Sequence, residues 1–200
     1  MRRSLAVLVF AAALGACARL PVASDGMSFT QRRAALEQYD SWEIRGRLAV
    51  DTGERGFQAS FDWQQRDDAL DLSIRGPLGT GALRITGTPD ALTVTTRGET
   101  RTLTDPENEL SELVGWWLPV ASLPAWLLGL PDPQFPSATT AGADGTLAAL
   151  EQRLWRLDFV SYRLDENLLL PRRIDLSHGE LELRVTIDNF TPAAQTAALN

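Results

Sequence analysis

Few side chains in this sequence are of types that carry catalysis, and their spacing gives them no partners. His178 is the only histidine and lies in the segment SHGE, which we predict to be a turn between two strands. Ser177 is adjacent to it, but neighbouring residues of a strand project to opposite faces, so the two side chains could not form a nucleophile–base pair. Asp67 and Asp68 lie in QQRDDA, whose composition favours a hairpin turn over a carboxylate dyad. We therefore expect no enzyme.

The sequence also contains no recognisable site for a metal ion, a phosphate group or nucleic acid. Its histidine, cysteine and acidic residues show no metal-ligand spacing, and the glycine-rich GPLGTG at residues 76–81 lacks the lysine and following helix of a phosphate loop. The chain has 19 arginines, no lysine and 26 acidic residues, a net charge of −7. An acidic chain without basic clusters argues against nucleic acid and against electrostatic docking on anionic lipid. We expect neither a metal nor a cofactor.

Cys17 is the residue whose surroundings predict a covalent modification. It is the only cysteine, which excludes a disulfide within the chain. Two arginines, an apolar run from Leu5 to Ala13 and a few small residues precede it, and these are the three parts of a secretory signal. The apolar run is too short for a permanent transmembrane helix. The alternative is a chance cysteine beside an ordinary cleavage site.

The segment LGAC at residues 14–17 resembles the lipobox of bacterial lipoproteins. This resemblance implies cleavage before Cys17, so that residues 1–16 are a signal peptide and residues 17–27 a lipidated tether. It also implies an S-diacylglycerol thioether and an N-acyl group on Cys17. Three acyl chains, each contributing about 0.8 kcal/mol per buried CH₂, would make the anchor permanent. Ala18, in place of aspartate, implies transport onward to the outer membrane.

Residues 28–200 are predicted to form a single domain that is mainly β with helices. Ser28 and Gln31 have the spacing of a helix capping box. From Trp42 onward, short segments alternate apolar with polar residues and are separated by turns, which predicts an antiparallel meander. One apolar face per strand indicates a curved sheet wrapped around something. We expect residues 129–145, rich in proline and glycine, to be a loop.

Two short helices are predicted in the middle of the chain. The first begins with Asp105 as its N-cap and Pro106 in its first position, and the second begins near Ser122 with Pro124 in its first turn. The very apolar segment GWWLPVASLPAWLLG at residues 115–129 follows the first helix and includes the second, and it holds three of the six tryptophans. These aromatic side chains either fill a barrel as ordinary core or form a lid over an apolar cavity. Periodicity alone cannot separate a filled barrel from a hollow one.

The turn predicted in RGPLGTG carries an apolar residue at its tip. Pro77 fixes φ and lacks an N–H, and Gly79 allows a positive φ, so both favour a turn around Leu78. Leu78 either folds back to close one end of a barrel or protrudes from the surface.

The motifs SWEIRGRLAV, FDWQQ, L-x-I-R-GPLG, GWWLPVASLPAWLLG, LPRRIDL and ELRVTIDNF, in this order from Trp42 to Phe190, resemble the LolB family of outer-membrane lipoproteins. The resemblance implies an open antiparallel half-barrel with a helical lid over an apolar cavity, similar to the carrier LolA. It implies a monomeric, lipid-anchored acceptor on the periplasmic face of the outer membrane. Such an acceptor receives triacylated lipoproteins from LolA and inserts them among outer-membrane phospholipids. Leu78, flanked by Pro77 and Gly79, matches an apolar residue that protrudes from a loop in that family, so we expect a membrane-insertion loop there.

The side chains expected to line the cavity come from the alternating strands and from the lid. They are Trp42, Ile44, Leu48, Phe57, Phe61, Trp63, Leu72, Ile74, Leu83 and Ile85 from strands, and Leu113, Trp117, Leu123, Trp126 and Leu127 from the lid. Three rival functions stay open. A structural lipoprotein of an outer-membrane assembly complex would have a filled core, and a lipid-modifying enzyme would need a polar cluster at the cavity mouth. The third is a non-catalytic binder of other lipids.

Overall fold

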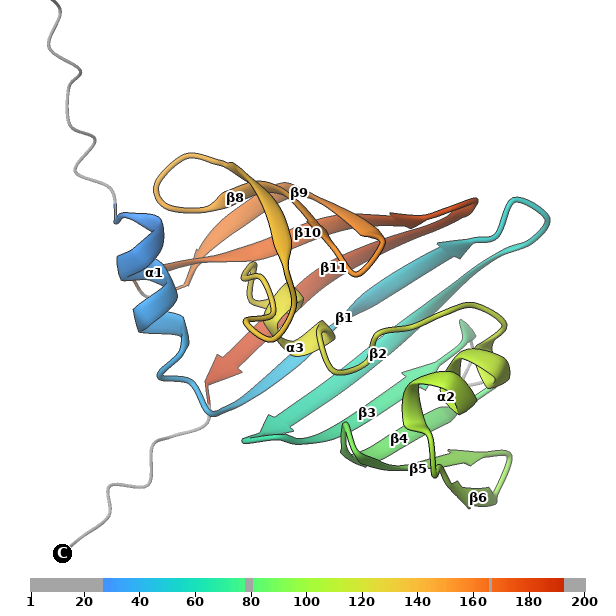
Figure 1. Ribbon diagram of the computed structural model, residues 1–200. Coiled ribbons are helices and arrows are strands. Elements are labelled where there is room, and N and C mark those ends of the chain that lie inside the picture. Colours follow the sequence, from blue (N-terminus) through green and yellow to red (C-terminus); the bar gives the residue numbers. More distant parts are fainter. Residues whose placement is uncertain (1–26, 78–80, 166, 193–200) are drawn as a thin grey trace, which may run out of the picture.

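A computed structural model describes residues 27–77, 81–165 and 167–192 (Figure 1). In this part of the chain, the strands form one 11-stranded antiparallel sheet in the order β6-β5-β4-β3-β2-β1-β11-β10-β9-β8-β7. The strands are β1 (Ser41–Asp51), β2 (Gly56–Arg66), β3 (Ala69–Arg75), β4 (Leu83–Thr88), β5 (Ala91–Thr96), β6 (Glu99–Thr102), β7 (Ser137–Ala141), β8 (Leu147–Gln152), β9 (Trp155–Asp165), β10 (Leu168–His178) and β11 (Leu181–Pro192). The helices are α1 (Phe29–Leu36), α2 (Pro106–Val114) and α3 (Leu123–Leu127).

The sheet is open, because its two edge strands β6 and β7 lie at opposite ends of the strand order. The first and last strands, β1 and β11, pair with each other in the middle of the sheet. In Figure 1 the sheet curves, and α3 lies against its concave side while α2 lies beside β4, β5 and β6. The predicted open half-barrel with a helical cover is confirmed.

Alternating burial along each strand explains why the sheet has one apolar, concave face. In β1, Trp42, Ile44 and Val50 are buried, whereas Arg45 and Arg47 are exposed. Arg45 pairs with Asn189 and Gly46 with Ile187, so Asp188 is the extra residue of a β-bulge in β11, opposite this point of β1. A larger residue could not replace Gly46, because a Cβ there would lie 2.2 Å from the carbonyl oxygen of Thr186.

The turns 52–55, 97–98, 153–154 and 179–180 all point to one end of the sheet, which we call the hairpin end. The pairings of Asp51 with Gly56 and with Glu182 place the first and last of these turns side by side. Helix α1 and the start of β1 lie at the opposite end (Figure 1). The end opposite the hairpin end therefore carries helix α1 and the first residues of β1, together with the β2–β3 and β4–β5 turns.

Helix α1 has the predicted capping box, with the Ser28 and Gln31 side chains each bonded to the other's backbone N–H. Its Arg32 is almost fully buried and donates to the carbonyl oxygens of Leu169, Leu128 and Gly129 at 2.8, 2.7 and 3.1 Å. Burial lowers the pKa of this guanidinium. Because Leu128 and Gly129 follow α3 directly, Arg32 fastens the end of α3 to α1 and β10.

Two local predictions need correction. Helix α2 begins at Pro106, but the Asp105 side chain makes no capping hydrogen bond. The carboxylate of Glu109, one turn into the helix, accepts the backbone N–H groups of Thr104 and Asp105 instead. Residues 129–145 were predicted to be loop throughout, yet Ser137–Ala141 forms the edge strand β7. Every residue of β7 is exposed, so no alternation of apolar and polar residues marks it as a strand.

Candidate functional site

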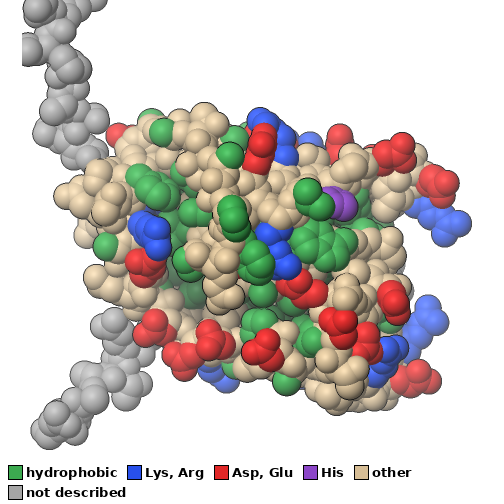
Figure 2. Space-filling view, in the orientation of Figure 1, with side chains coloured by type: hydrophobic (Ala, Val, Ile, Leu, Met, Phe, Trp, Pro, Cys, Tyr) green, Lys and Arg blue, Asp and Glu red, His purple; other side chains and the backbone are tan. Residues whose placement is uncertain are grey.

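The concave face of the sheet and the segment across it enclose a cavity of about 370 Å³. We call residues 106–130, which comprise α2, α3 and their connection, the lid segment. Every side chain on the cavity wall is apolar, and Gly81 adds only backbone; the wall consists of Leu48, Val50, Phe57, Phe61, Trp63, Leu72, Ile74, Gly81, Leu83, Ile85, Val114, Trp116, Leu118, Leu123, Trp126, Leu127, Trp155, Ile174, Leu176, Leu183 and Val185. Figure 2 shows hydrophobic side chains gathered in the middle of this face, with charged side chains around them.

Eleven of the fifteen side chains predicted for the cavity wall lie on it. On strands β1 to β4, every second side chain faces the concave side of the sheet, and this alternation places the predicted residues on the cavity wall. Helical spacing places those of α3. The eleven are Leu48, Phe57, Phe61, Trp63, Leu72, Ile74, Leu83, Ile85, Leu123, Trp126 and Leu127.

The structure places the other four elsewhere, which corrects their predicted positions. Trp42 and Ile44 are buried on the same face, but near the α1 end, where the rings of Trp42 and Phe190 have centroids 6.4 Å apart. Leu113 is 47% exposed on α2, and its neighbour Val114 faces the cavity instead. Trp117 packs outside the cavity, and its ring lies 5.8 Å from that of His178.

Sequence reasoning missed the far half of the wall. Leu183 and Val185 belong to an alternating run in β11 that could have indicated them. Ile174, Leu176 and Trp155 lie on β10 and β9, which pack beside it. The other missed residues are Val50, Gly81, Val114, Trp116 and Leu118.

A buried polar network attaches α3 to strand β8. The Trp126 indole Nε1 donates to Oε1 of Gln152 at 2.8 Å, and Nε2 of Gln152 donates to the carbonyl oxygens of Asp132 and Phe135 at 2.8 Å each. The Ser122 hydroxyl, at the start of α3, donates to Oδ2 of Asp132 at 2.6 Å. Satisfied buried networks of this kind hold elements in one arrangement. Trp126 is thereby fixed on the cavity wall.

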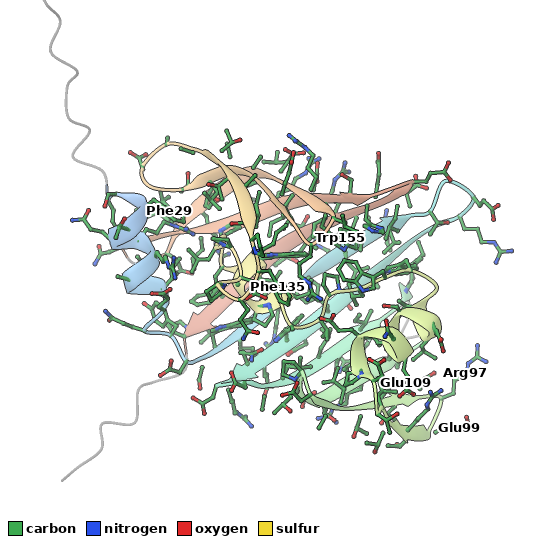
Figure 3. All side chains as sticks on the ribbon, viewed as in Figure 1. Phe29, Arg97, Glu99, Glu109, Phe135 and Trp155 are labelled. Atoms are coloured by element: carbon green, nitrogen blue, oxygen red, sulfur yellow. The ribbon has the colours of Figure 1, made fainter. Side chains whose placement is uncertain are left out.

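Arg153 connects the turn between β8 and β9 to α2. Its Nη1 and Nη2 lie 2.9 and 2.6 Å from the two carboxylate oxygens of Glu107. Its guanidinium carbon is 4.1 Å from the ring centre of Phe135 and 5.0 Å from that of Trp117. Figure 3 labels Phe135 and Trp155 in front of the sheet, and Glu109 on α2 near the turn that carries Arg97. Aromatic contacts and a two-bond ion pair together hold Arg153 in place.

The fold places the candidate catalytic residues His178 and Asp67–Asp68 at opposite ends of the sheet. His178 ends β10, and its ring stacks on Trp155 with centroids 5.3 Å apart. Asp67 and Asp68 occupy the hairpin turn between β2 and β3, where Asp67 has a φ of 49°. Within the described residues, no group of three or more His, Cys, Asp or Glu side chains is placed to hold a metal ion. What this site can do is bind an apolar molecule.

Three of the predicted functional residues fall outside the described part of the chain. Cys17 lies outside the described residues, as do Leu78 and Gly79 of the predicted insertion loop. Pro77 is described and lies shortly after the end of β3, among the turns at the hairpin end. Each helix in the described part of the chain is too short to cross a membrane.

Comparison with known proteins gives a family for the sequence. The family model described as "Outer membrane lipoprotein LolB" matches residues 40–190. Proteins named "Outer-membrane lipoprotein LolB" are similar over most of their length. The one from Nitrosococcus oceani is 34% identical over 85% of this chain and 86% of its own. The one from Pseudomonas fluorescens is 34% identical over 95% of this chain and 96% of its own. The one from Pseudomonas savastanoi pv. phaseolicola is 33% identical over 84% of this chain and 82% of its own.

Solved structures share the fold at very low sequence identity. A LolA superfamily protein from Nitrosomonas europaea aligns with a TM-score of 0.52 at 9% identity, over 80% of this chain and 92% of its own. A DUF1329 family protein from Desulfovibrio piger aligns with a TM-score of 0.55 at 7% identity, over 84% and 91%. At these identities the likeness concerns the fold alone.

Proposed function

The chain belongs to the LolB family of outer-membrane lipoproteins, and on that premise we propose that its cavity accepts the acyl chains of other lipoproteins. The observation that carries this proposal is the all-apolar wall of a cavity of about 370 Å³. That volume lies within the range of about 300–1,000 Å³ typical of sites for small molecules. A cavity so lined offers an acyl chain burial among apolar side chains, with very little polar surface to desolvate.

Area burial supplies the affinity for such a ligand. Each methylene removed from water contributes about 0.8 kcal/mol, so a chain of ten or more methylenes brings a large gross free energy. Transfer from a carrier then requires only that this cavity be the better apolar host. It needs neither a cofactor nor a catalytic step, in keeping with the isolated position of His178 beside Trp155.

The finer steps of this proposal come from the family and from the sequence motifs. The protein is anchored by an N-acyl, S-diacylglyceryl Cys17 to the outer membrane and faces the periplasm. It receives triacylated lipoproteins from LolA and releases them among membrane phospholipids, with the Leu78 loop entering the lipid. The fold that the chain shares with a LolA superfamily protein supports a direct transfer between two proteins of similar architecture.

A structural lipoprotein without a ligand is the main competing function. Its half-barrel would be filled by its own side chains, and the open volume among Phe61, Trp63 and Trp126 argues against this. A lipid-modifying enzyme would need polar groups at the cavity, whereas the wall formed by the described residues is apolar throughout.

The test uses the mature chain from residue 17 with Cys17→Ser, so that its own acyl chains cannot occupy the cavity. After purification from cells, mass spectrometry should detect bound acylated lipoprotein or its acylated peptide. LolA loaded with a fluorescently labelled lipoprotein should lose that lipoprotein to the variant. A protein that carries no acylated ligand and takes none from LolA would show that the cavity serves another purpose.

A further inference from the structure

Four tryptophans line the cavity, and their indole N–H groups fall into two classes. Trp63 donates to Oε1 of Gln65 at 2.9 Å, and Trp126 donates to Oε1 of Gln152 at 2.8 Å. The Nε1 atoms of Trp116 and Trp155 are buried, and no described residue accepts a hydrogen bond from either. Leaving a buried donor without an acceptor costs about 1–3 kcal/mol, and such groups are rare in native proteins.

The two unpartnered indoles belong to the hairpin end of the cavity. Trp155 is the first residue of β9 and stacks on His178, the last residue of β10, at 5.3 Å. The ring centre of Trp116 lies 6.3 Å from that of Phe57, which is near the start of β2. Trp63 lies further along β2, where it pairs with Ile44. The cavity is thus uniform in its apolarity but has two unused donors toward one end.

Water is a poor partner for these two donors. An ordered internal water needs two to four polar partners, and the side chains on this wall are all apolar. A ligand that brings its own acceptors into the cavity is the better match. The acyl groups of a lipidated cysteine carry such acceptors, because each chain ends in an ester or amide carbonyl where it joins the glycerol or the nitrogen.

We propose that Trp116 and Trp155 donate hydrogen bonds to the carbonyl oxygens of acyl ester or amide linkages. The cavity would then select acyl lipids over alkyl molecules of equal length. This inference rests on the proposed function, since it names the residues that would bind the polar carbonyl end of the same acyl ligand. Both nitrogens are shielded in the ligand-free protein, although their rings line the wall. Binding therefore includes a rotation of each indole that turns its N–H toward the occupant.

The test compares two lipids that differ only in the carbonyl. Monopalmitoylglycerol and 1-O-hexadecylglycerol displace an apolar fluorophore from the mature chain carrying Cys17→Ser. A net hydrogen bond is worth roughly a five- to tenfold change in affinity, so the ester should bind about five- to tenfold more tightly than the ether. Equal affinities of the unsubstituted cavity for ester and ether would overturn the inference while leaving the proposed function intact.

Phenylalanine substitutions remove the donor and keep an aromatic ring. Trp116→Phe and Trp155→Phe, singly and together, should reduce the ester-to-ether preference toward one, where the preference is the ratio of the two affinities measured on the same variant. Trp117→Phe is the matched control, because its ring packs outside the cavity against His178 and Arg153, and its ester-to-ether preference should stay at the wild-type value. Melting temperatures identify any variant that fails to fold, and the wild-type comparison needs no variant. A preference that survives in the double variant would also overturn the inference. A wild-type protein that binds neither lipid would overturn the proposed function together with it.

Discussion

Arg153 and Glu107 form a two-bond ion pair that joins the two separated edges of the half-barrel. Arg153 lies in the turn between β8 and β9, beside the edge strand β7, and Glu107 lies in α2, which an Arg101–Glu109 ion pair fastens to the other edge strand, β6. The side chains of Arg153 and Glu107 are only 12% and 22% exposed. The pair therefore ties the lid segment across the gap that the open sheet leaves.

Removing one charge of this pair should loosen the lid segment. Glu107→Gln leaves the guanidinium of Arg153 partly buried without its counter-charge, so we expect a loss of about 1–3 kcal/mol in the free energy of unfolding. An apolar fluorophore should also enter the cavity faster, as stopped-flow mixing would measure. The exposed i,i+4 pair of Arg33 with Glu37 gives the control, since Glu37→Gln should change stability by less than about 0.5 kcal/mol. An unchanged entry rate in Glu107→Gln would show that the pair does not govern access.

Acid should weaken the attachment of α2 through Glu109. The pKa of Glu109 is lowered to about 2, first because its carboxylate accepts the N–H of Asp105, and then through Thr104 and Arg101. The pKa of this carboxyl is lower in the folded protein than in the unfolded chain, where it is near 4.5. Its ionised form therefore stabilises the folded protein fully above pH 4.5, and this stabilisation is lost as the pH falls toward 2. Melting temperatures between pH 5 and pH 2 should thus fall more steeply in the wild type than in Glu109→Gln. The exposed Glu112→Gln, on the same helix, should keep the wild-type slope.

Glycine should stabilise the turn that carries Arg153. Both turn residues have positive φ, 51° for Arg153 and 65° for Leu154, and Leu154 is 86% exposed. A leucine in this conformation is strained by about 1 kcal/mol relative to glycine, so Leu154→Gly should raise the free energy of unfolding by about 0.5–1 kcal/mol. Leu164→Gly, within β9 and 68% exposed, should lower it by a similar amount. Urea denaturation measures both, and a less stable Leu154→Gly would mean that the leucine packs against something essential.

The β1 backbone at Gly46, opposite the bulge in β11, should tolerate no side chain. A Cβ at this position would meet the Thr186 carbonyl oxygen at 2.2 Å and the Phe61 ring at 2.8 Å, so Gly46→Ala must push apart two strands in the centre of the sheet. We expect a loss of about 2 kcal/mol or more, or a chain that does not fold. Gly56→Ala is the matched control, because its Cβ would lie 3.5 Å from the nearest atom, the carbonyl oxygen of Val50. Circular dichroism melting would distinguish them, and equal melting temperatures would contradict the crowding at Gly46.

Release into lipid should depend on Leu78, which lies outside the described residues. Leu78→Glu should cost about 0.5 kcal/mol, the scale of a surface substitution, but should oppose entry of the loop into a bilayer. Uptake of a labelled lipoprotein from LolA should survive, and its transfer into liposomes should fail. Thermal melting and a liposome-transfer assay score the two effects separately. A large drop in melting temperature with uptake also lost would assign Leu78 to the core.

The strands and half of the cavity wall could be predicted because they depend on local pattern. Alternation alone placed Phe61, Trp63 and Leu72 on the concave face. The same alternation could not say how far along a strand the cavity extends. Trp42 and Ile44 have the right parity, but they lie where Leu36, Tyr39 and Phe190 fill the space. How far the cavity extends along a strand depends on which other parts of the chain pack against that strand. The periodicity of the strand itself does not contain this information.

The lid segment was predicted less well because its backbone changes conformation within it. Helix α2 ends at Val114, and Gly115 adopts a positive φ of 89°, so helical spacing no longer applies beyond it. Val114 and Trp116 therefore face the cavity, where Leu113 and Trp117 were expected. No sequence pattern could predict which indole N–H groups lack an acceptor, because this depends on which side chains lie near each tryptophan in the folded wall.

The pairing of β1 with β11 also governs when the binding site can come into existence. It joins Trp42 to Pro192, residues 150 positions apart, so the centre of the sheet closes a very long loop of chain. Closing so long a loop is entropically costly, and such non-local pairing makes folding slow. Hairpins such as β2–β3 and β9–β10 can assemble locally beforehand. The cavity, whose wall is divided between β1–β4 and β9–β11, forms only when the final strand docks. An incomplete chain therefore has no place to hold a lipid, and binding competence arises together with the finished fold.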